Sequence, residues 1–550
     1  MKICYYFDES RKKVCNSAGL DYTPAYIPVM LKTAGLTGSP VSASGVRELS
    51  AGDVLIIGAE TLDPNAAEDI KKAADRGCRI IGFGTEAPEL FPETEPFEPG
   101  GGAYDVSGYF RYSDSVSLPV IGRVAAIKNA PVLGTFESLN GCAVPAYSAD
   151  GGVYYYSFDL PLTLWHAADG RPTYEPRQDF VPFGRVPDGC VLPDDYDFDV
   201  PYADEYMKRV CDAVGFPRVF ELPADNDDIY DFSLYFAGDD DAGSADNDIY
   251  AAREMAKRGL PYHINLMPAN DEGDFVINRD QYEYLGSIGC ETDLHFDFTR
   301  FEYSEDGYKK QAGMYERAFG NKPVCPVNHC LIQAGEAADR YRYQSACKAI
   351  SDNNRFQTKP DKNNINAFNL TGFASGTSYP RFVLDNAAHG NAPIPFCEIN
   401  NSYYEPRIYT GAPEEYEKLE KYLDAGSDRA MTLQLFLHPH YISGKIGFDP
   451  SPALRALDHA LAYIRNKKMK VWFTAPQALS KWWHSRAECA ITDVENNGFV
   501  FDNRTGRQAA VVLPCRVNTV FVNNENDRII KKRGVCYVPL GPGRSEVKYE

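Results

Sequence analysis

The stretch Asp231–Gly243, DFSLYFAGDDDAG, joins a short apolar strand to a run of acidic residues. The strand covers Phe232–Ala237 and stops at Gly238, and the residues that follow are Asp239, Asp240 and Asp241. Like charges crowded at one strand end repel one another, which raises carboxyl pKa values unless a cation lies between them. Because α/β folds place their chemistry at the carboxyl ends of parallel strands, this stretch predicts a metal and general-base site; the alternative is an acidic surface turn.

Residues 226–487 repeat a strand–helix pattern, with Gly or polar residues at the junctions. This alternation is typical of parallel sheets. The expected helices are 246–258, 279–288, 305–319, 413–424, 452–466 and 476–483, and the expected further strands are 261–267, one ending at His295, 323–328, 431–437 and 470–474. Six or more such units running in one direction predict a (β/α) barrel, complete or distorted.

Different patterns flank this unit. Residues 1–165 alternate short apolar strands with helices, which predicts a doubly wound α/β domain. Residues 166–225 are rich in Pro, Asp and Gly and are interpreted as a long connecting segment. Residues 488–550 carry short strands between Asn, Gly and Asp turns, which predicts a small β-sandwich. The expected fold class is therefore α/β, with a distorted barrel between an α/β domain and a β-sandwich.

Four of the nine histidines fall at the carboxyl ends of expected strands: His295, His329, His438 and His440. The other five lie in mid-strand, mid-helix or loop contexts and are interpreted as structural or surface residues. Imidazoles and a carboxylate around one open site are ligands that suit Zn²⁺ or a similar divalent ion. Such an ion activates water, a second carboxylate can take the proton, and a separate histidine can protonate the leaving group. These residue types suffice for hydrolysis of an amide or ester.

With these residues, the segment 231–487 resembles the polysaccharide deacetylase superfamily. Members of this family carry paired aspartates after a strand, the first a general base and the second a metal ligand. Counting back from the next strand, Tyr262-His263-Ile264-Asn265-Leu266-Met267, places the pair at Asp240 and Asp241. A pair one residue earlier, Asp239 and Asp240, is the alternative.

The histidine motifs of the family match in part. The second motif, His-x-x-x-His, begins at His295, but Thr299 occupies the position of its second histidine. At the next strand end His329 stands where the family usually carries an Arg and a Pro. The late Leu-x-His motif corresponds to Leu-Phe-Leu-His ending at His438, and His440 is a close competitor.

The resemblance implies a metal-dependent hydrolase that removes acetyl groups, as amide or ester, from a carbohydrate. Its cofactor would be a divalent ion, with Zn²⁺ as the first choice. The implied roles are Asp240 as general base, His438 as general acid, Asp241, His295 and His329 as metal ligands, and Asp297 and His440 as substrate contacts. Asp297, beside His295, is also the alternative to His329 as the ligand that replaces the missing histidine.

The N-terminal unit resembles the glutamine-amidotransferase-like (flavodoxin-like) domains attached to many carbohydrate-active enzymes. In active amidotransferases a Cys occupies a sharp turn after a strand, whereas the corresponding turn here is Gly82-Phe83-Gly84-Thr85-Glu86. Without this thiol the domain is expected not to be catalytic. No phosphate-binding glycine motif follows the first strand, so nucleotide binding is not expected either.

Charge and cysteine usage limit the partners. The formal net charge of −21 would be repelled by nucleic acid and by anionic membranes. No apolar run approaches the roughly 20 residues that a membrane helix needs. The 14 cysteines include no CxxC pair and several lie in apolar strand patterns, which is typical of reduced thiols and a cytoplasmic location. The expected partner is a carbohydrate, and a homo-oligomer is left open.

Two other functions fit the same sequence. A glycoside hydrolase on this kind of barrel would use two carboxylates, for example one of Asp239–Asp241 together with Glu398. A non-enzymatic glycan-binding protein would be a degenerate barrel between two accessory domains, and the absence of the family's second histidine favours it. Sensitivity to a chelator and the presence of turnover distinguish the three.

Overall fold

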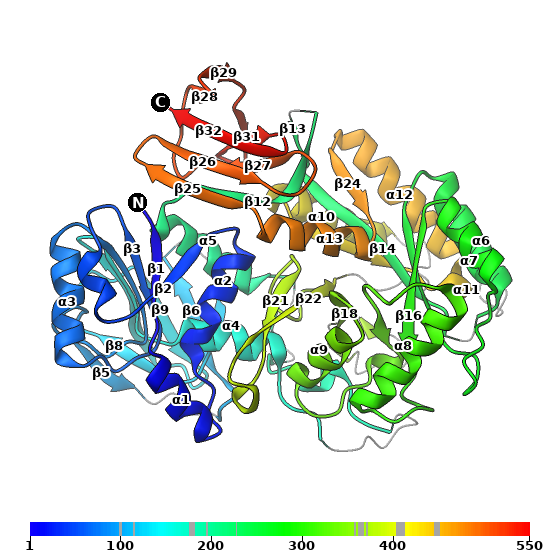
Figure 1. The fold of residues 1–550 in the computed structure, drawn as a ribbon, viewed down its shortest axis with the longest axis horizontal. Coiled ribbons are helices and arrows are strands. Elements are labelled where there is room, and N and C mark those ends of the chain that lie inside the picture. The colour runs from blue at the N-terminus through cyan, green and yellow to red at the C-terminus, as the bar shows by residue number, and fades with distance from the viewer. Residues whose placement is uncertain are drawn as a thin grey trace.

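The structure is a computed structural model, and it consists of three units that lie against one another (Figure 1). The N-terminal unit is blue to cyan, a half-barrel unit is mostly green, and the C-terminal β-strands are orange to red. The residues described are 1–97, 102–113, 116–174, 182–193, 196–197, 199–226, 228–241, 243–356, 359–360, 368–369, 372–402, 413–444 and 451–550. None of the helices in this described part of the chain combines the length and the apolar character that crossing a bilayer requires.

The N-terminal sheet is parallel in one half and antiparallel in the other. The parallel strands are, in order, β2 (Gly38–Val41), β1 (Ile3–Tyr6), β3 (Val54–Ile57), β4 (Arg79–Phe83) and β11 (Val153–Tyr156). The antiparallel strands continue as β10 (Ala143–Asp150), β9 (Gly134–Ser138), β6 (Val106–Tyr112) and β7 (Leu118–Ile121). The first half follows the expected strand–helix alternation, with α2 (Ile27–Thr33) and α3 (Pro64–Asp75). The antiparallel pairing of the second half was not predicted; short turns rather than periodic helices connect most of its strands.

The turn after β4 is tight. Gly84 has φ 62°, in the left-handed region, and a Cβ there would lie 3.1 Å from the backbone nitrogen of Asp159. The following Thr85 is buried and its hydroxyl donates to the Gly58 carbonyl at 2.7 Å. Glycine is therefore required at this turn, and the hydroxyl of Thr85 is used within the fold.

A six-stranded parallel sheet forms the half-barrel. Its order is β17 (Val327–Asn328), β16 (Cys290–Phe296), β15 (Tyr262–Leu266), β14 (Phe232–Asp239) and β23 (Thr432–Phe436), and β24 (Val471–Thr474) also pairs with β14. β15 pairs with the carboxyl half of β14, whereas β24 pairs with its amino half. Every residue of β14 is buried, as its apolar sequence requires of a central parallel strand. Because all of these pairings are parallel, the strands deliver their carboxyl ends to one edge.

The helices around this sheet begin where the sequence supplies caps. They are α6 (Ala245–Lys257), α7 (Arg279–Ser287), α8 (Glu305–Phe319), α10 (Pro413–Arg429), α12 (Ser451–Lys467) and α13 (Pro476–Ala487). Ser244 and Ser304 accept backbone hydrogen bonds at the starts of α6 and α8, and Asn278 forms a capping box with Gln281 at α7. These six helices begin within one residue of the predicted starts, whereas α10 and α13 continue five and four residues beyond the predicted ends.

Among the described residues, backbone pairing does not close the sheet into a barrel. The strands β18 (Ser351–Phe356), β22 (Pro393–Asn401) and β21 (Arg381–Leu384) form a separate sheet, and α9 (Ala337–Ala346) precedes them. Backbone-to-side-chain hydrogen bonds connect the two sheets at two places. The Asn328 N–H donates to Asn354 Oδ1 at 2.7 Å, and the Gln434 N–H donates to Ser402 Oγ at 3.2 Å. The sequence analysis missed these four elements because polar residues interrupt their patterns. The observed sheet is thus a half-barrel with a side-chain-linked continuation.

The expected connecting segment contains regular structure. It includes α5 (Tyr202–Val214) and β12 (Arg218–Asp225), neither of which was predicted. β12 pairs antiparallel with β27 (Ala509–Val512), so a strand that precedes the half-barrel joins the C-terminal strands. The first of the two C-terminal antiparallel sheets has the order β13 (Asp228–Ile229), β12, β27, β31 (Val535–Leu540) and β30 (Ile530–Lys532). The second has the order β25 (Ala490–Glu495), β26 (Gly498–Asn503), β32 (Gly543–Tyr549), β28 (Val520–Val522) and β29 (Glu525–Asp527). β-Sheet pairing of distant segments is invisible to local patterns, which explains why β12 was assigned to the connection.

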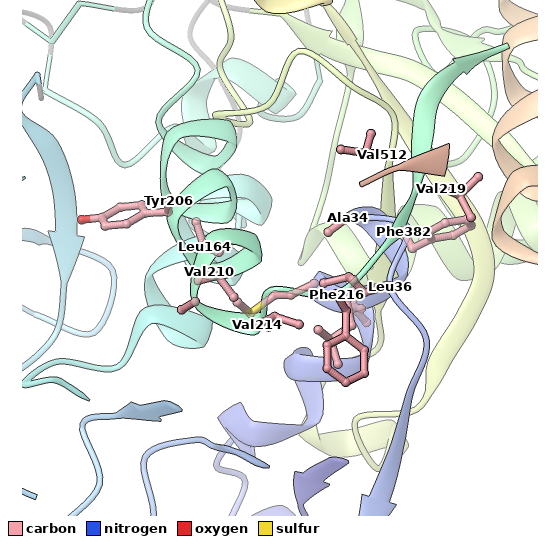
Figure 2. Packing of buried hydrophobic residues seen from close by; sticks show 14 of the residues in the cluster. Ala34, Leu36, Leu164, Tyr206, Val210, Val214, Phe216, Val219, Phe382 and Val512 are labelled. Carbon is pink, nitrogen blue, oxygen red and sulfur yellow. The ribbon is translucent and has the colours of Figure 1, made fainter. Parts of the chain in front are cut away.

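One hydrophobic core connects the N-terminal unit to the C-terminal strands. Figure 2 shows Val210 and Val214 of α5 beside Leu164 and near Phe216, with Val219 of β12 and Val512 of β27 in the same cluster. A second core lies within the half-barrel unit, between its sheet and helices such as α6 and α12. The N-terminal and C-terminal units therefore bury apolar surface in common, and Tyr235, Trp472 and Trp483 of the half-barrel unit contribute to the same core.

Candidate metal centre

Three predicted metal ligands meet at the carboxyl edge of the half-barrel sheet. Asp241 follows β14, His295 is the penultimate residue of β16, and His329 follows β17. His295 Nε2 lies 3.0 Å and His329 Nδ1 lies 3.2 Å from Asp241 Oδ1, and the two ring nitrogens are 3.1 Å apart. His438, after β23, places Nε2 at 3.2 Å from the other oxygen, Asp241 Oδ2. The structure thus gathers residues that are separated by up to 197 positions in the chain.

The donor set fits a divalent ion. Two imidazole nitrogens that face each other at 3.1 Å need a shared proton or a cation between them, since two lone pairs or two N–H groups would repel. Ligand bonds of about 2.0–2.2 Å in a tetrahedral zinc site imply ligand–ligand distances of about 3.3 Å, close to the separations of the three donor atoms here. The set of two nitrogens and one oxygen leaves a position open for water or substrate.

The same contacts set the protonation of Asp241 and His329. Partial burial opposes ionisation of Asp241. Contacts with His438, His295 and His329 more than offset this effect, and they hold the pKa of the carboxyl group well below its ordinary value. Burial likewise opposes protonation of His329, yet its contacts with Asp241 and Cys330 raise the pKa of this imidazole to about 10. An incoming ion must therefore displace a proton from His329.

We expect zinc affinity to rise with pH. Below the raised pKa of His329, each unit of pH should increase the apparent association constant by up to tenfold, because one bound proton competes with the ion. Calorimetric titration with Zn²⁺ between pH 6 and 7.5, in buffers of different ionisation enthalpy, should report release of about one proton per ion. An affinity that does not change over this range would contradict a protonated His329.

A second carboxylate beside the centre is held by a polar chain. Asp239, the last residue of β14, lies opposite Asn265 of β15, and Asn265 Nδ2 donates to Asp239 Oδ1 at 2.8 Å. Asn265 Oδ1 is 3.0 Å from His263 Nε2, and the other nitrogen of His263 is 3.3 Å from Glu291 Oε2. Because Asn265 engages Oδ1, the other oxygen, Asp239 Oδ2, faces the ligand group and lies 3.9 Å from His295 Nε2. The polar chain orients Asp239 through side chains of the neighbouring strands β15 and β16.

Sequence reasoning missed this chain. It treated His263 as a mid-strand structural residue and did not consider Asn265. The available signal was the two-residue spacing, since residues i and i+2 of a strand share a face. Both side chains are buried, which for polar groups requires hydrogen-bond partners.

Asp240 lies apart from the ligating atoms. Its carboxyl group is buried and accepts no hydrogen bond from a side chain of the described residues. Burial, followed by the negative charges of Asp248 and Asp241, raises the pKa of Asp240 far above that of an ordinary carboxyl. Burial raises the pKa of Asp248 on α6 as well. A carboxyl group that stays protonated at neutral pH is poorly suited to accept a proton.

The two predicted substrate contacts occupy different surroundings. His440, on the short helix α11 (Pro439–Ser443), is buried with its ring centroid 5.1 Å from that of His438. Asp297 is buried, and its carboxylate accepts from the Thr299 N–H at 2.9 Å and from Arg300 Nε at 2.5 Å. These bonds hold the pKa of Asp297 below its ordinary value although burial opposes this. Asp297 is thus engaged in a local turn, and His329 rather than Asp297 accompanies His295 in the ligand group.

Glu398 belongs to a buried ion network. It is on β22 and nearly inaccessible, and it pairs with Arg340 of α9 and Arg381 of β21. Arg381 also contacts Asp169 Oδ1 at 2.6 Å, which links this network to α4 (Leu160–Asp169) of the N-terminal unit. A carboxylate held by two guanidinium groups cannot readily exchange protons with a substrate. The network is structural.

We found no match to a protein-family model and none among curated proteins. Among solved structures, a putative polysaccharide deacetylase from Mycobacterium smegmatis is 13% identical, with 47% of this chain and 92% of that chain covered and a TM-score of 0.32. A putative polysaccharide deacetylase involved in O-antigen biosynthesis from Bordetella bronchiseptica is 11% identical, with 44% and 92% covered and a TM-score of 0.27. A CE4 family pseudoenzyme from Bacillus anthracis is 10% identical, with 45% and 65% covered and a TM-score of 0.25. Similarities of this size do not transfer an activity to this chain.

Proposed function

We propose that this protein is a metal-dependent hydrolase that removes acetyl groups from a carbohydrate. The observation that carries the proposal is the convergence of Asp241, His295 and His329 within hydrogen-bonding distance of one another. Beside this ligand group lie a carboxylate, Asp239, and an imidazole, His438. A ligand set, a base and an acid at one sheet edge are what hydrolysis of an amide or ester requires.

The roles follow from the contacts. When bound, a divalent ion lowers the pKa of water and polarises the acetyl carbonyl. Asp239 is the proposed general base in place of Asp240, because its Oδ2 lies near His295 while Asn265 holds its Oδ1. His438 is the proposed general acid, since its Nε2 contacts the Asp241 oxygen that the two ligand histidines leave free. Its ring packs edge-on against Phe436, which fixes its orientation.

The substrate class comes from the resemblance and from charge. The motifs at His295 and His438 resemble those of polysaccharide deacetylases, so N-acetylated or O-acetylated sugars are the proposed substrates. A net charge of −21 favours neutral or cationic sugars, and loss of an N-acetyl group yields a cationic amine. The glycoside hydrolase hypothesis loses support, because Arg340 and Arg381 bind the carboxylate of Glu398 in a buried ion network.

The proposal is tested by metal content and by acetate release. Purified protein should contain close to one equivalent of a divalent ion, and it should release acetate from N-acetylated or O-acetylated oligosaccharides. A chelator should abolish this activity, and Zn²⁺ should restore it. Full activity of metal-free protein would refute the metal site, whereas sugar binding without acetate release would favour a glycan-binding protein.

Removing the amide that holds Asp239 should slow the reaction without removing the metal. Asn265→Ala deletes the donor to Asp239 Oδ1, so the base should lose its orientation and kcat should fall about 10- to 100-fold. KM and zinc content should change little, because the side chain of Asn265 bonds Asp239 and His263 rather than the proposed ligands Asp241, His295 and His329. Steady-state kinetics with elemental analysis checks this; equal kcat in the variant would show that Asp239 needs no such support.

A further inference from the structure

The chain takes an unusual turn immediately after β17. Cys330 has φ 54° and ψ 17°, and Leu331 has φ 55°, so two consecutive non-glycine residues adopt the left-handed conformation. Side chains of neighbouring residues in an extended strand point to opposite faces. Here the turn brings Cys330 Sγ to 3.4 Å from Nε2 of the preceding His329. A disfavoured backbone conformation at this site indicates a constraint that the surroundings maintain.

Leu331 shows how the turn is held. Its side chain packs against Ala237 of β14 and Phe436 of β23, two buried residues inside the half-barrel. The ring of Phe436 in turn contacts that of His438 at a centroid distance of 4.9 Å. Packing of Leu331 therefore fixes the residue next to Cys330, and the turn cannot relax without exposing this apolar contact.

The contact with Cys330 decides what His329 can do. His329 directs Nδ1 towards Asp241 and His295, whereas Nε2 faces the sulfur. An imidazole that binds an ion through Nδ1 carries its proton on Nε2, and the partner of that second nitrogen sets the tautomer and the ring orientation. Sulfur is a weak but sufficient acceptor for this N–H.

We propose that Cys330 is a positioning residue that accepts the Nε2–H of His329 and so aims Nδ1 at the metal. This inference rests on the proposed metal site. It assigns to the thiol a role outside the ligand group, since the sulfur contacts the ring nitrogen that faces away from Asp241. Nothing in the resemblance to deacetylases supplies such a cysteine.

The test measures Zn²⁺ affinity by competition titration for the wild type and three variants. Cys330→Ala removes the acceptor and should weaken binding about 10- to 100-fold, the usual effect of losing an outer partner of a ligand histidine. Cys330→Ser keeps an acceptor and should retain most of the affinity. Cys330→Gly removes the acceptor but relieves the left-handed backbone, so it should be as weak as Cys330→Ala. Thermal melting in chelator should show that all four proteins fold.

A spectrum with Co²⁺ separates positioning from ligation. A thiolate ligand would produce an intense sulfur-to-cobalt band in the near ultraviolet, and the difference between wild type and Cys330→Ser should show no such band. A band that disappears in Cys330→Ser would make the sulfur a ligand and overturn the proposal.

Other outcomes are equally decisive. Wild-type affinity in Cys330→Ala, or in Cys330→Gly alone, would overturn the role of the thiol while the metal site stands. A wild-type protein that binds no divalent ion would overturn the inference together with the proposed function.

Discussion

Replacing Asp241 by alanine is expected to abolish metal binding and to lower acetate release by roughly a thousandfold. Asp241 contacts His295, His329 and His438, so its loss removes the carboxylate at which these three imidazoles meet. Several kcal/mol of transition-state stabilisation by a bound ion correspond to about three powers of ten in rate. Elemental analysis and an acetate assay on the same preparation measure both effects.

Two controls accompany this experiment. Asp241→Asn preserves the size of the side chain but removes its charge, and it should lose most of the zinc while staying folded. Asp458→Ala removes an exposed carboxylate on α12 that pairs with Arg258, and it should leave metal and activity unchanged. If Asp241→Ala retains a full equivalent of zinc and full activity, the ligand assignment is wrong.

Replacing Asp239 by asparagine is expected to lower kcat by about 10²- to 10⁴-fold while zinc stays bound. The substitution removes the proposed general base, and general bases contribute rate factors of this size. Asp241, His295 and His329 remain in place, so the metal content should not change. Steady-state kinetics at saturating zinc measures the effect on kcat and on KM separately.

The neighbouring carboxyl group provides the matched control. Asp240→Asn exchanges a group whose pKa is already strongly raised by burial and by Asp248 for a neutral one of the same shape, so kcat should stay within a few-fold of wild type. The reverse pattern, with Asp240→Asn inactive and Asp239→Asn active, would restore the assignment of the base to Asp240 that the sequence suggested.

Periodicity predicted most of the half-barrel. The apolar run 232–237 predicted the strand β14. The caps and glycine stops predicted the bounds of α6, α7 and α8 within one or two residues. The elements between His329 and residue 413 were missed. Their strands are rich in buried Asn, Asp and Arg, as in Ser351–Phe356, and these residues are stable inside only because distant partners such as Arg340 and Glu398 pair with them.

The sequence by itself determined that acidic side chains and histidines gather at one place. Asp241, His295, His329 and His438 each lie at or just after the carboxyl end of a strand, and parallel strands in one sheet must bring these ends to the same edge. The residue types at these positions also limit the ion to those that accept nitrogen and oxygen ligands. Both conclusions follow from local patterns and from the direction of the strands.

Only the tertiary structure decided which atoms face one another. Three consecutive aspartates have nearly identical sequence contexts, but the turn after β14 directs Asp241 to the histidines, Asp240 towards Asp248 and Asp239 to Asn265. The partner strand β15 and the helix α6 select these directions, and both are made by other parts of the chain. Side-chain direction at a strand end depends on backbone dihedral angles that long-range packing sets, and no local pattern encodes them.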